Sequence, residues 1–287
     1  MEVLMKKREK IMEYVFLLAA VISIVAVALI CIFLFANGIP AMKKIGFAEF
    51  LTGTKWKPGN NKFGIFPMIL GSIYVTGGAL IIGVPVGVLT SIFMARFCPE
   101  GLYKLLKPVV NLLAGIPSVV YGFFGLVVIV PLIQKTFDLP VGETAFAGSV
   151  VLAIMALPTI ITVAEDAMRT TPRAMKEASL ALGATQWQTI YKVIIPYSIS
   201  GITSAVVLGI GRAIGETMAV LMVTGNAAVI PTSFFEPVRT IPATIAAELG
   251  EAPAGGAHYE ALFLLVLFLI TLILSISVEY ISSKRKI

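Results

Sequence analysis

Long apolar runs separated by short polar segments dominate the chain. A membrane-spanning helix needs about 20 mostly apolar residues, and six stretches of the sequence reach that length. They lie at approximately 12–36, 66–95, 106–134, 147–168, 197–225 and 259–281. The first stretch follows a basic segment, but it is longer than the apolar core of a secretory signal peptide, so we interpret it as an anchor. The pattern predicts an all-α integral membrane protein with six transmembrane helices in a single domain, 1–287.

The positions of Lys and Arg between the apolar stretches predict the orientation. With the N-terminus inside, 14 of these residues fall in inner segments and seven in outer loops, and Arg212 alone falls within a span. We therefore expect a multi-pass protein of the cell (inner) membrane with both termini in the cytoplasm. The long outer loops are then 37–65 and 226–258, and the long inner segment is 169–196. In the second outer loop TIPATIAAEL, which begins at Thr240, predicts a short helix.

Composition supports a membrane protein and excludes several other classes. The chain is 58% hydrophobic and 13% charged, whereas soluble domains are about 25% charged. Its two Cys and one His do not by themselves supply a zinc site or a disulfide framework, so we expect no metal. The net charge is +6, but the cations flank apolar segments instead of forming one basic face, which argues against nucleic-acid binding. The sequence has no phosphate-binding loop of ATPases, so we expect no catalytic residues and no ATP hydrolysis by this chain.

The inner segment, 169–196, has the start and stop signals of two short helices. Thr171 can cap the first, with Pro172 at its first position and Gly183 at its end. Thr185 can cap the second, and Pro196 is expected to end it. In each unit the apolar residues share one face: Ala174, Ala178, Ala181 and Leu182, then Trp187, Ile190, Tyr191 and Ile194. Periodicity alone leaves two interpretations, a helix pair lying on the membrane surface and a docking element for a cytoplasmic partner.

The order of residues in this segment resembles the EAA loop of ABC importer permeases. The resemblance rests on Glu177, Ala178, Ser179, Gly183, Ile194 and Pro196. Ser179 departs from the family triplet, which ends in Ala. In that family the loop forms a coupling helix between helices 4 and 5, and this helix sits in a cleft of a separate ATPase that uses ATP and Mg²⁺. The resemblance therefore implies a type I ABC importer permease-like fold, a coupling role for these six residues and no cofactor in this chain.

A charged pair lies within the fifth apolar stretch, in GIGRAIGETMAV at 209–220. Charges inside a span are costly, about 2.5–3.5 kcal/mol on insertion scales, and are functional by default. A spacing of four residues places Arg212 and Glu216 on one helix face. The planar Arg212 fork matches two oxygens of a tetrahedral oxyanion. We expect Glu216 to hold the guanidinium or to favour an anion that still carries a proton, as phosphate does and sulfate does not.

A plainer interpretation of the pair is a structural ion pair in the bundle interior. Next to it, Gly211 and Gly215 form a Gly-x-x-x-Gly pattern. Small residues at this spacing allow a neighbouring helix to approach closely. We therefore expect a helix–helix seam beside the charged pair.

GRAIGETMAVLMVTGN is similar to a signature of the PstC family of phosphate importer permeases, in which an Arg and a Glu of this span are needed for transport. The outer-loop stretch WKPGNNKFGIFP, which begins at Trp56, also looks like that family, and the resemblance covers nearly the whole chain. It implies a substrate pathway that includes Arg212 and Glu216. It also implies a second permease subunit (PstA-like), two ATP-binding subunits (PstB-like) and an external phosphate-binding protein (PstS-like).

The sequence thus predicts one permease subunit of an ATP-driven inorganic phosphate importer, forming half of the translocation path. Three alternatives stay open. The chain can be a permease of the same class for another oxyanion or small solute. It can be an ion-coupled secondary transporter in which Glu216 carries a proton, or a structural or sensory membrane protein that binds a signalling partner through its inner segment.

Overall fold

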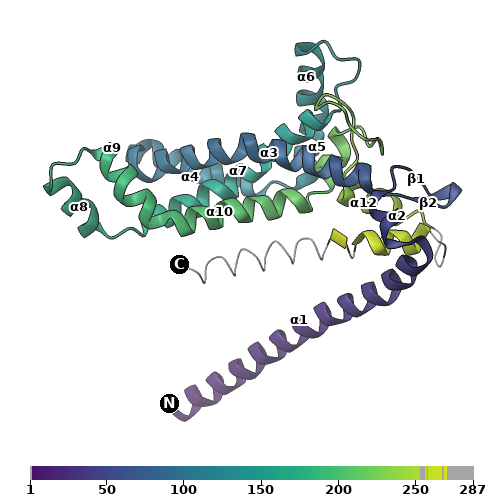
Figure 1. Cartoon of the computed structure of the whole chain (residues 1–287). Coiled ribbons are helices and arrows are strands. Elements are labelled where there is room, and N and C mark those ends of the chain that lie inside the picture. Colours follow the sequence, from purple (N-terminus) through teal and green to yellow (C-terminus); the bar gives the residue numbers. More distant parts are fainter. Residues whose placement is uncertain (1, 253–255, 257, 267, 270–287) are drawn as a thin grey trace.

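The computed structural model describes residues 2–252, 256, 258–266 and 268–269, and they form an elongated helical bundle (Figure 1). Four helices make up its length: α3 (Phe66–Ile92), α4 (Glu100–Gly115), α7 (Ala145–Arg169) and α10 (Ile195–Gly215). Helix α7 packs against both α3 and α10 and is the most buried of the described candidate spans. It therefore forms the centre of the bundle.

The other elements lie at the two ends of the bundle, connect its helices or, in the case of α1, lean away from it (Figure 1). In chain order they are α1 (Glu2–Ile45), α2 (Phe47–Thr52), β1 (Trp56–Lys57), η1 (Pro58–Asn60), β2 (Lys62–Phe63), η2 (Phe93–Phe97), α5 (Ser118–Phe124), η3 (Gly125–Ile129), α6 (Val130–Thr136), α8 (Arg173–Ala181), α9 (Gln186–Thr189), η4 (Ile190–Ile194), α11 (Met218–Val223) and α12 (Ile241–Glu248). Here η1 is a 3₁₀ turn, and η2, η3 and η4 are π-helical turns.

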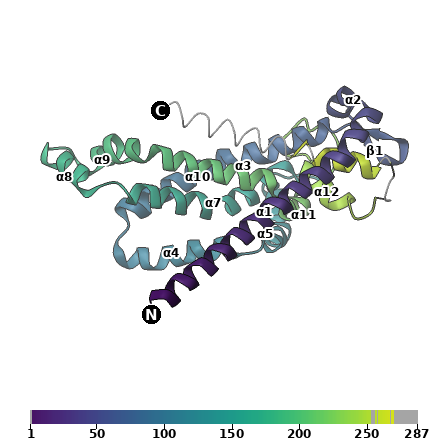
Figure 2. The ribbon, with the colours of Figure 1, turned by 90° about the horizontal axis from the view of Figure 1, so that it is seen from below.

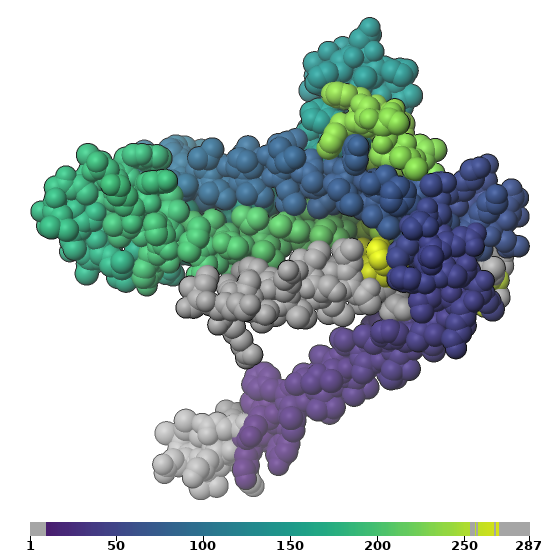
Figure 3. Space-filling model, viewed as in Figure 1, coloured from purple at the N-terminus to yellow at the C-terminus, as the bar shows by residue number. Residues whose placement is uncertain are grey.

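Five helices of the described residues are long and apolar enough to cross a membrane: Lys10–Ile45, Phe66–Phe97, Ser118–Thr136, Ala145–Arg169 and Gln186–Gly215. Most of the predicted sixth span, 259–281, lies outside the described residues. The first span belongs to α1, which leans away from the bundle (Figures 1 and 3). Its apolar side chains are exposed along most of its length, so we expect lipid or another subunit to cover them.

Two predicted spans are interrupted in the structure. The stretch 106–134 breaks where α4 ends, because Pro117 disfavours helical backbone in the preceding Ile116, which is extended. The stretch 197–225 breaks at Glu216, whose φ of −70° and ψ of 132° are also extended, and α11 starts two residues later. Apolar composition alone predicted one continuous helix in each case.

Small residues of α10 allow its close approach to α7. A Cβ atom built at Gly201 would lie 2.3 Å from Ala167, and one at Gly209 would lie 2.7 Å from another α7 side chain. By contrast, Cβ atoms at Gly211 and Gly215 would meet no atom of the described chain within 4 Å. The seam within the described chain therefore uses the first two glycines, and a seam at Gly211 and Gly215 stays a prediction for a neighbouring subunit.

A cap closes the end of the bundle opposite α8. Strands β1 and β2 pair antiparallel, with Trp56 opposite Phe63. The carboxylate of Glu248, at the end of α12, accepts hydrogen bonds from Trp56 Nε1 at 2.8 Å and Arg239 Nη1 at 2.5 Å, and it pairs with His258 Nε2 at 2.8 Å. One carboxylate thus joins the β1–β2 strand pair, α12 and the start of the helix at 258–266. The short helix predicted from Thr240 is confirmed as α12.

Candidate functional site

Arg212 lies near the end of α10 and faces α7. Its Nη1 donates to Thr159 Oγ1 at 3.3 Å. Within the described part of the chain, no carboxylate lies within ion-pair distance of the guanidinium. Its remaining N–H groups therefore have no side-chain acceptor there, and they can bind an anion that enters the bundle.

Glu216 makes a different contact from the one its spacing predicts. Because α10 ends at Gly215, the extended backbone of Glu216 removes it from the helix face that carries Arg212. Glu216 Oε1 instead accepts a hydrogen bond from the backbone N–H of Ala219 at 3.3 Å and so caps the start of α11. The predicted contact between Arg212 and Glu216 is therefore wrong for this conformation, as an orienting contact and as an ion pair.

Thr159 is a site residue that the sequence analysis missed. It lies in α7, and 53 positions of chain separate it from Arg212. Hydroxyl side chains are common in apolar helices, and no local signal marks the one that faces an arginine of another helix. The packing of α7 against α10 places the Thr159 hydroxyl beside Arg212.

Helices α8 and α9 form a hairpin at the far end of the bundle (Figures 1 and 2). Gly183 ends α8 with a φ of +84°, and the backbone N–H of Ala184 donates to Ser179 O at 3.2 Å. Thr185 and Gln188 form a capping box at the start of α9. The predicted end at Gly183 and the predicted cap at Thr185 are confirmed.

Three other expectations for this segment need correction. Helix α8 starts after Pro172, and Thr171 Oγ1 is buried with no hydrogen-bond partner among the described residues, so Thr171 is not a cap. Pro196 does not end a helix, because helix continues from α9 through η4 into α10, and a π-helical turn accommodates a residue that has no N–H. Ile194 is fully buried in the core beside α7, so it does not contribute to the hairpin surface.

Large apolar side chains are exposed on the hairpin and on η4, which follows it. Those exposed are Met175, Leu180, Leu182, Trp187 and Tyr191. Leu182, at the tip, is 90% exposed. Glu177 and Ala178 are also exposed, while Ser179 Oγ lies 3.0 Å from Thr189 Oγ1 and joins the two helices. A hairpin that projects beyond the bundle suits a docking element better than a helix pair lying flat on a membrane.

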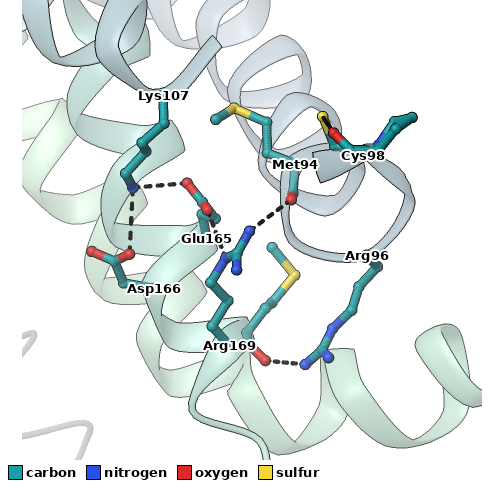
Figure 4. A network of polar contacts seen from close by, with 9 residues as sticks. Met94, Arg96, Cys98, Lys107, Glu165, Asp166 and Arg169 are labelled. Carbon is teal, nitrogen blue, oxygen red and sulfur yellow. Dashed lines mark hydrogen bonds and ion pairs between the residues drawn. The ribbon is translucent and has the colours of Figure 1, made fainter. Parts of the chain in front are cut away.

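A buried ionic network lies next to this hairpin (Figure 4). The Glu165 side chain is 0% exposed, and its carboxylate contacts Lys107 Nζ at 2.8 Å and Arg169 Nε at 2.7 Å. Arg169 Nη2 also donates to the carbonyl of Met94 at 3.1 Å. Burial works against the charged form of Lys107, and its hydrogen bond to the Glu165 carboxylate offsets that cost. The network joins α4, α7 and η2, and the sequence analysis missed it because the ion pair between Lys107 and Glu165 spans 58 positions.

The comparisons with known proteins agree with this architecture. A family model described as the binding-protein-dependent transport system inner membrane component matches residues 87–287. The chain belongs to this family. Membership of this family implies that the chain works with a partner ATPase and a binding protein.

Relatives of this permease extend over most of its length. It is 41% identical over 274 residues to the probable ABC transporter permease protein YqgH of Bacillus subtilis, with 93% of this chain and 89% of that protein covered. It is 40% identical to the phosphate transport system permease protein PstC of Mesorhizobium japonicum, with 90% and 85% covered.

A solved structure confirms the fold class. The permease matches a chain of a bacterial ABC transporter that imports the acidic polysaccharide alginate, with a TM-score of 0.63, 18% identity and coverage of 91% and 93%. At this identity the likeness shows the fold alone. The predicted type I ABC importer permease-like fold is confirmed, while the count of six spans and the coupling role of the hairpin stay predictions.

Proposed function

We propose that this permease is the transmembrane subunit of an ATP-driven inorganic phosphate importer and forms half of its translocation path. One observation carries the proposal: Arg212 enters the apolar bundle with a hydroxyl as its side-chain partner and no carboxylate in ion-pair contact among the described residues. A guanidinium in this state binds a tetrahedral oxyanion through two parallel hydrogen bonds. Relatives named as phosphate transport permeases support phosphate as that anion.

The importer contains three kinds of partner for this chain. These are a second permease subunit, two ATP-binding subunits that use ATP and Mg²⁺, and an external phosphate-binding protein. We place the α8–α9 hairpin and both termini in the cytoplasm and the cap around Glu248 on the outer side, as the Lys and Arg positions predict. Because the sequence has no phosphate-binding loop of ATPases, the hairpin is the contact of this chain with the energy source.

The path from the hairpin to Arg212 is a single helical segment. Helix is continuous from Gln186 to Gly215, and the 25 residues between Trp187 and Arg212 extend about 40 Å at 1.5 Å per residue. When ATP closes the ATPase pair, movement of the docked hairpin therefore moves Arg212 directly. This arrangement links nucleotide state to exposure of the anion site on one side of the membrane or the other.

Reconstitution of the full importer in liposomes tests the proposal. With the binding protein on one side and ATP on the other, labelled phosphate should accumulate only when ATP is present. Uptake that persists without ATP, or that needs a proton gradient, would contradict the ATP-driven mechanism and favour an ion-coupled secondary transporter. Uptake of sulfate in preference to phosphate would agree with an ATP-driven importer but contradict phosphate as its substrate.

Glu216→Gln separates the charge of Glu216 from its capping role. The glutamine carbonyl can still accept from the Ala219 N–H, whereas Glu216→Ala removes the cap as well. We expect Glu216→Gln to narrow the phosphate-over-sulfate preference of uptake by about tenfold, because the carboxylate no longer repels a fully deprotonated anion. The measurement is competition between the two labelled anions. An unchanged preference with normal uptake would remove Glu216 from anion selection and leave it as a cap.

Gly183→Ala tests the hairpin. A Cβ atom at Gly183 has open space around it, so the cost comes from the left-handed backbone alone, about 1–2 kcal/mol. We expect weaker association with the ATPase subunits, and a milder effect for Gly183→Asn because Asn tolerates this backbone. Gly101→Ala is the matched control, since its Cβ also meets open space without positive φ. Equal association of all three variants would contradict the coupling role.

A further inference from the structure

A charged cavity lies beside the base of the α8–α9 hairpin. It has a volume of about 480 Å³. Its lining comes from η2, from the α7–α8 connection and from α8: Arg96, Thr171, Arg173, Lys176, Glu177 and Leu180. The cavity is separate from Arg212, which lies toward the opposite end of α10 from η4.

Two buried polar atoms of this cavity have no partner. Thr171 is 7% exposed, and its Oγ1 has no hydrogen-bond partner in the described structure. The Nε of Arg96 is in the same state, although Nη2 of the same guanidinium donates to the carbonyl of Met168 (Figure 4). Leaving a buried donor without an acceptor costs about 1–3 kcal/mol. Two such atoms belong to residues that line one cavity, so a ligand that they can turn toward would remove this cost.

The charges around the cavity define the chemistry of that ligand. Three lining residues are cationic, Arg96, Arg173 and Lys176, and one is anionic, Glu177. None of the three cations forms an ion pair with a carboxylate in the described structure. The start of α8 also lies at the cavity, and no side chain caps it. Its first N–H groups and the positive end of its dipole therefore add to the attraction for an anion.

We propose that this cavity binds a phosphate group, either free inorganic phosphate or the headgroup of an anionic lipid. Arg173 and Lys176 neutralise its charge, and rotation of the Arg96 and Thr171 side chains toward the cavity lets Nε and Oγ1 donate to its oxygens. A bound phosphate group bridges η2 and α8, and so braces the hairpin against the end of α3. This site is independent of the transport site, and its test does not depend on uptake.

The test measures binding of labelled inorganic phosphate to the assembled importer without its external binding protein. The complex carries Arg212→Ala, so the proposed transport site does not contribute, and it is held in nanodiscs of phosphatidylcholine. We expect saturable binding that Arg96→Gln weakens about tenfold and Thr171→Val about fivefold. Thr171→Ser should restore it because the hydroxyl returns. Lys192→Gln, which removes an exposed cation of η4 outside the cavity, should change the dissociation constant less than about twofold.

A second arm distinguishes the two sources of the phosphate group. In nanodiscs that contain phosphatidylglycerol, a lipid occupant would compete with inorganic phosphate, and mass spectrometry of the complex would show lipid retained by wild type and lost in Thr171→Val. A free phosphate occupant would bind equally well in both kinds of nanodisc. If neither phosphate nor lipid binding falls in Arg96→Gln and Thr171→Val, the proposal is wrong. It is also wrong if these variants lose only the ATPase subunits, because the cavity would then be a protein contact.

Discussion

Replacing Arg212 by alanine is expected to reduce ATP-dependent phosphate uptake at least about a hundredfold. Two charge-assisted hydrogen bonds to the anion are lost, each worth about 1.5–3 kcal/mol, and each 1.4 kcal/mol is about a factor of ten. The side chain contacts Thr159 and no carboxylate of the described chain. Its removal therefore leaves no buried counter-charge unpaired, and we expect the importer to assemble normally.

Arg212→Lys gives the matched comparison. Lysine keeps the charge but presents a point charge in place of a planar fork, so we expect a loss of about tenfold, between wild type and the alanine variant. Uptake into liposomes is measured for each variant after size-exclusion chromatography has shown an intact complex. Wild-type uptake by an assembled Arg212→Ala importer would contradict the role of Arg212 and would remove the main support for the proposed function.

Replacing Glu165 by alanine is expected to destabilise the permease by about 3 kcal/mol. The carboxylate is fully buried between Lys107 and Arg169, and removal of one member of a buried ion pair leaves an uncompensated charge, at a cost of about 3–5 kcal/mol. We expect the lower end of that range because the Arg169 side chain is 43% exposed and water can solvate it. The thermal unfolding midpoint of the detergent-solubilised complex measures the effect.

Asp166→Ala is the control for Glu165. Asp166 is the next residue of α7 and contacts the same lysine, Lys107, at 3.5 Å, but its side chain is 63% exposed. A solvent-exposed pair of this kind contributes less than about 1 kcal/mol. Equal unfolding midpoints for the two alanine variants would show that the Glu165 network does not hold α4, α7 and η2 together.

Local sequence patterns were sufficient for several elements. Apolar runs of spanning length predicted the membrane class, because hydrocarbon requires a helix to satisfy its own backbone. The left-handed backbone at Gly183 and the capping box at Thr185 followed from residues within a few positions of each other. The order of residues in the EAA-like segment was enough to identify the fold family, since the family model includes it.

Local patterns failed where hydropathy did not show a backbone break. The stretch 197–225 is apolar enough on average to predict one continuous span, yet α10 ends at Gly215 and the Glu216 carboxylate caps α11 instead of pairing with Arg212. Spacing of four residues places two side chains together only while the helix continues through both.

The sequence by itself determined that this protein crosses the membrane in helices, carries a helical hairpin between two of them and places an arginine inside an apolar segment. Tertiary structure alone decided which groups contact that arginine and which carboxylate is buried. Thr159 meets Arg212, and Glu165 meets Lys107, across more than 50 positions of chain. The physical reason is that local patterns depend on neighbours within one or two turns, whereas partners on different helices depend on how the helices rotate and pack.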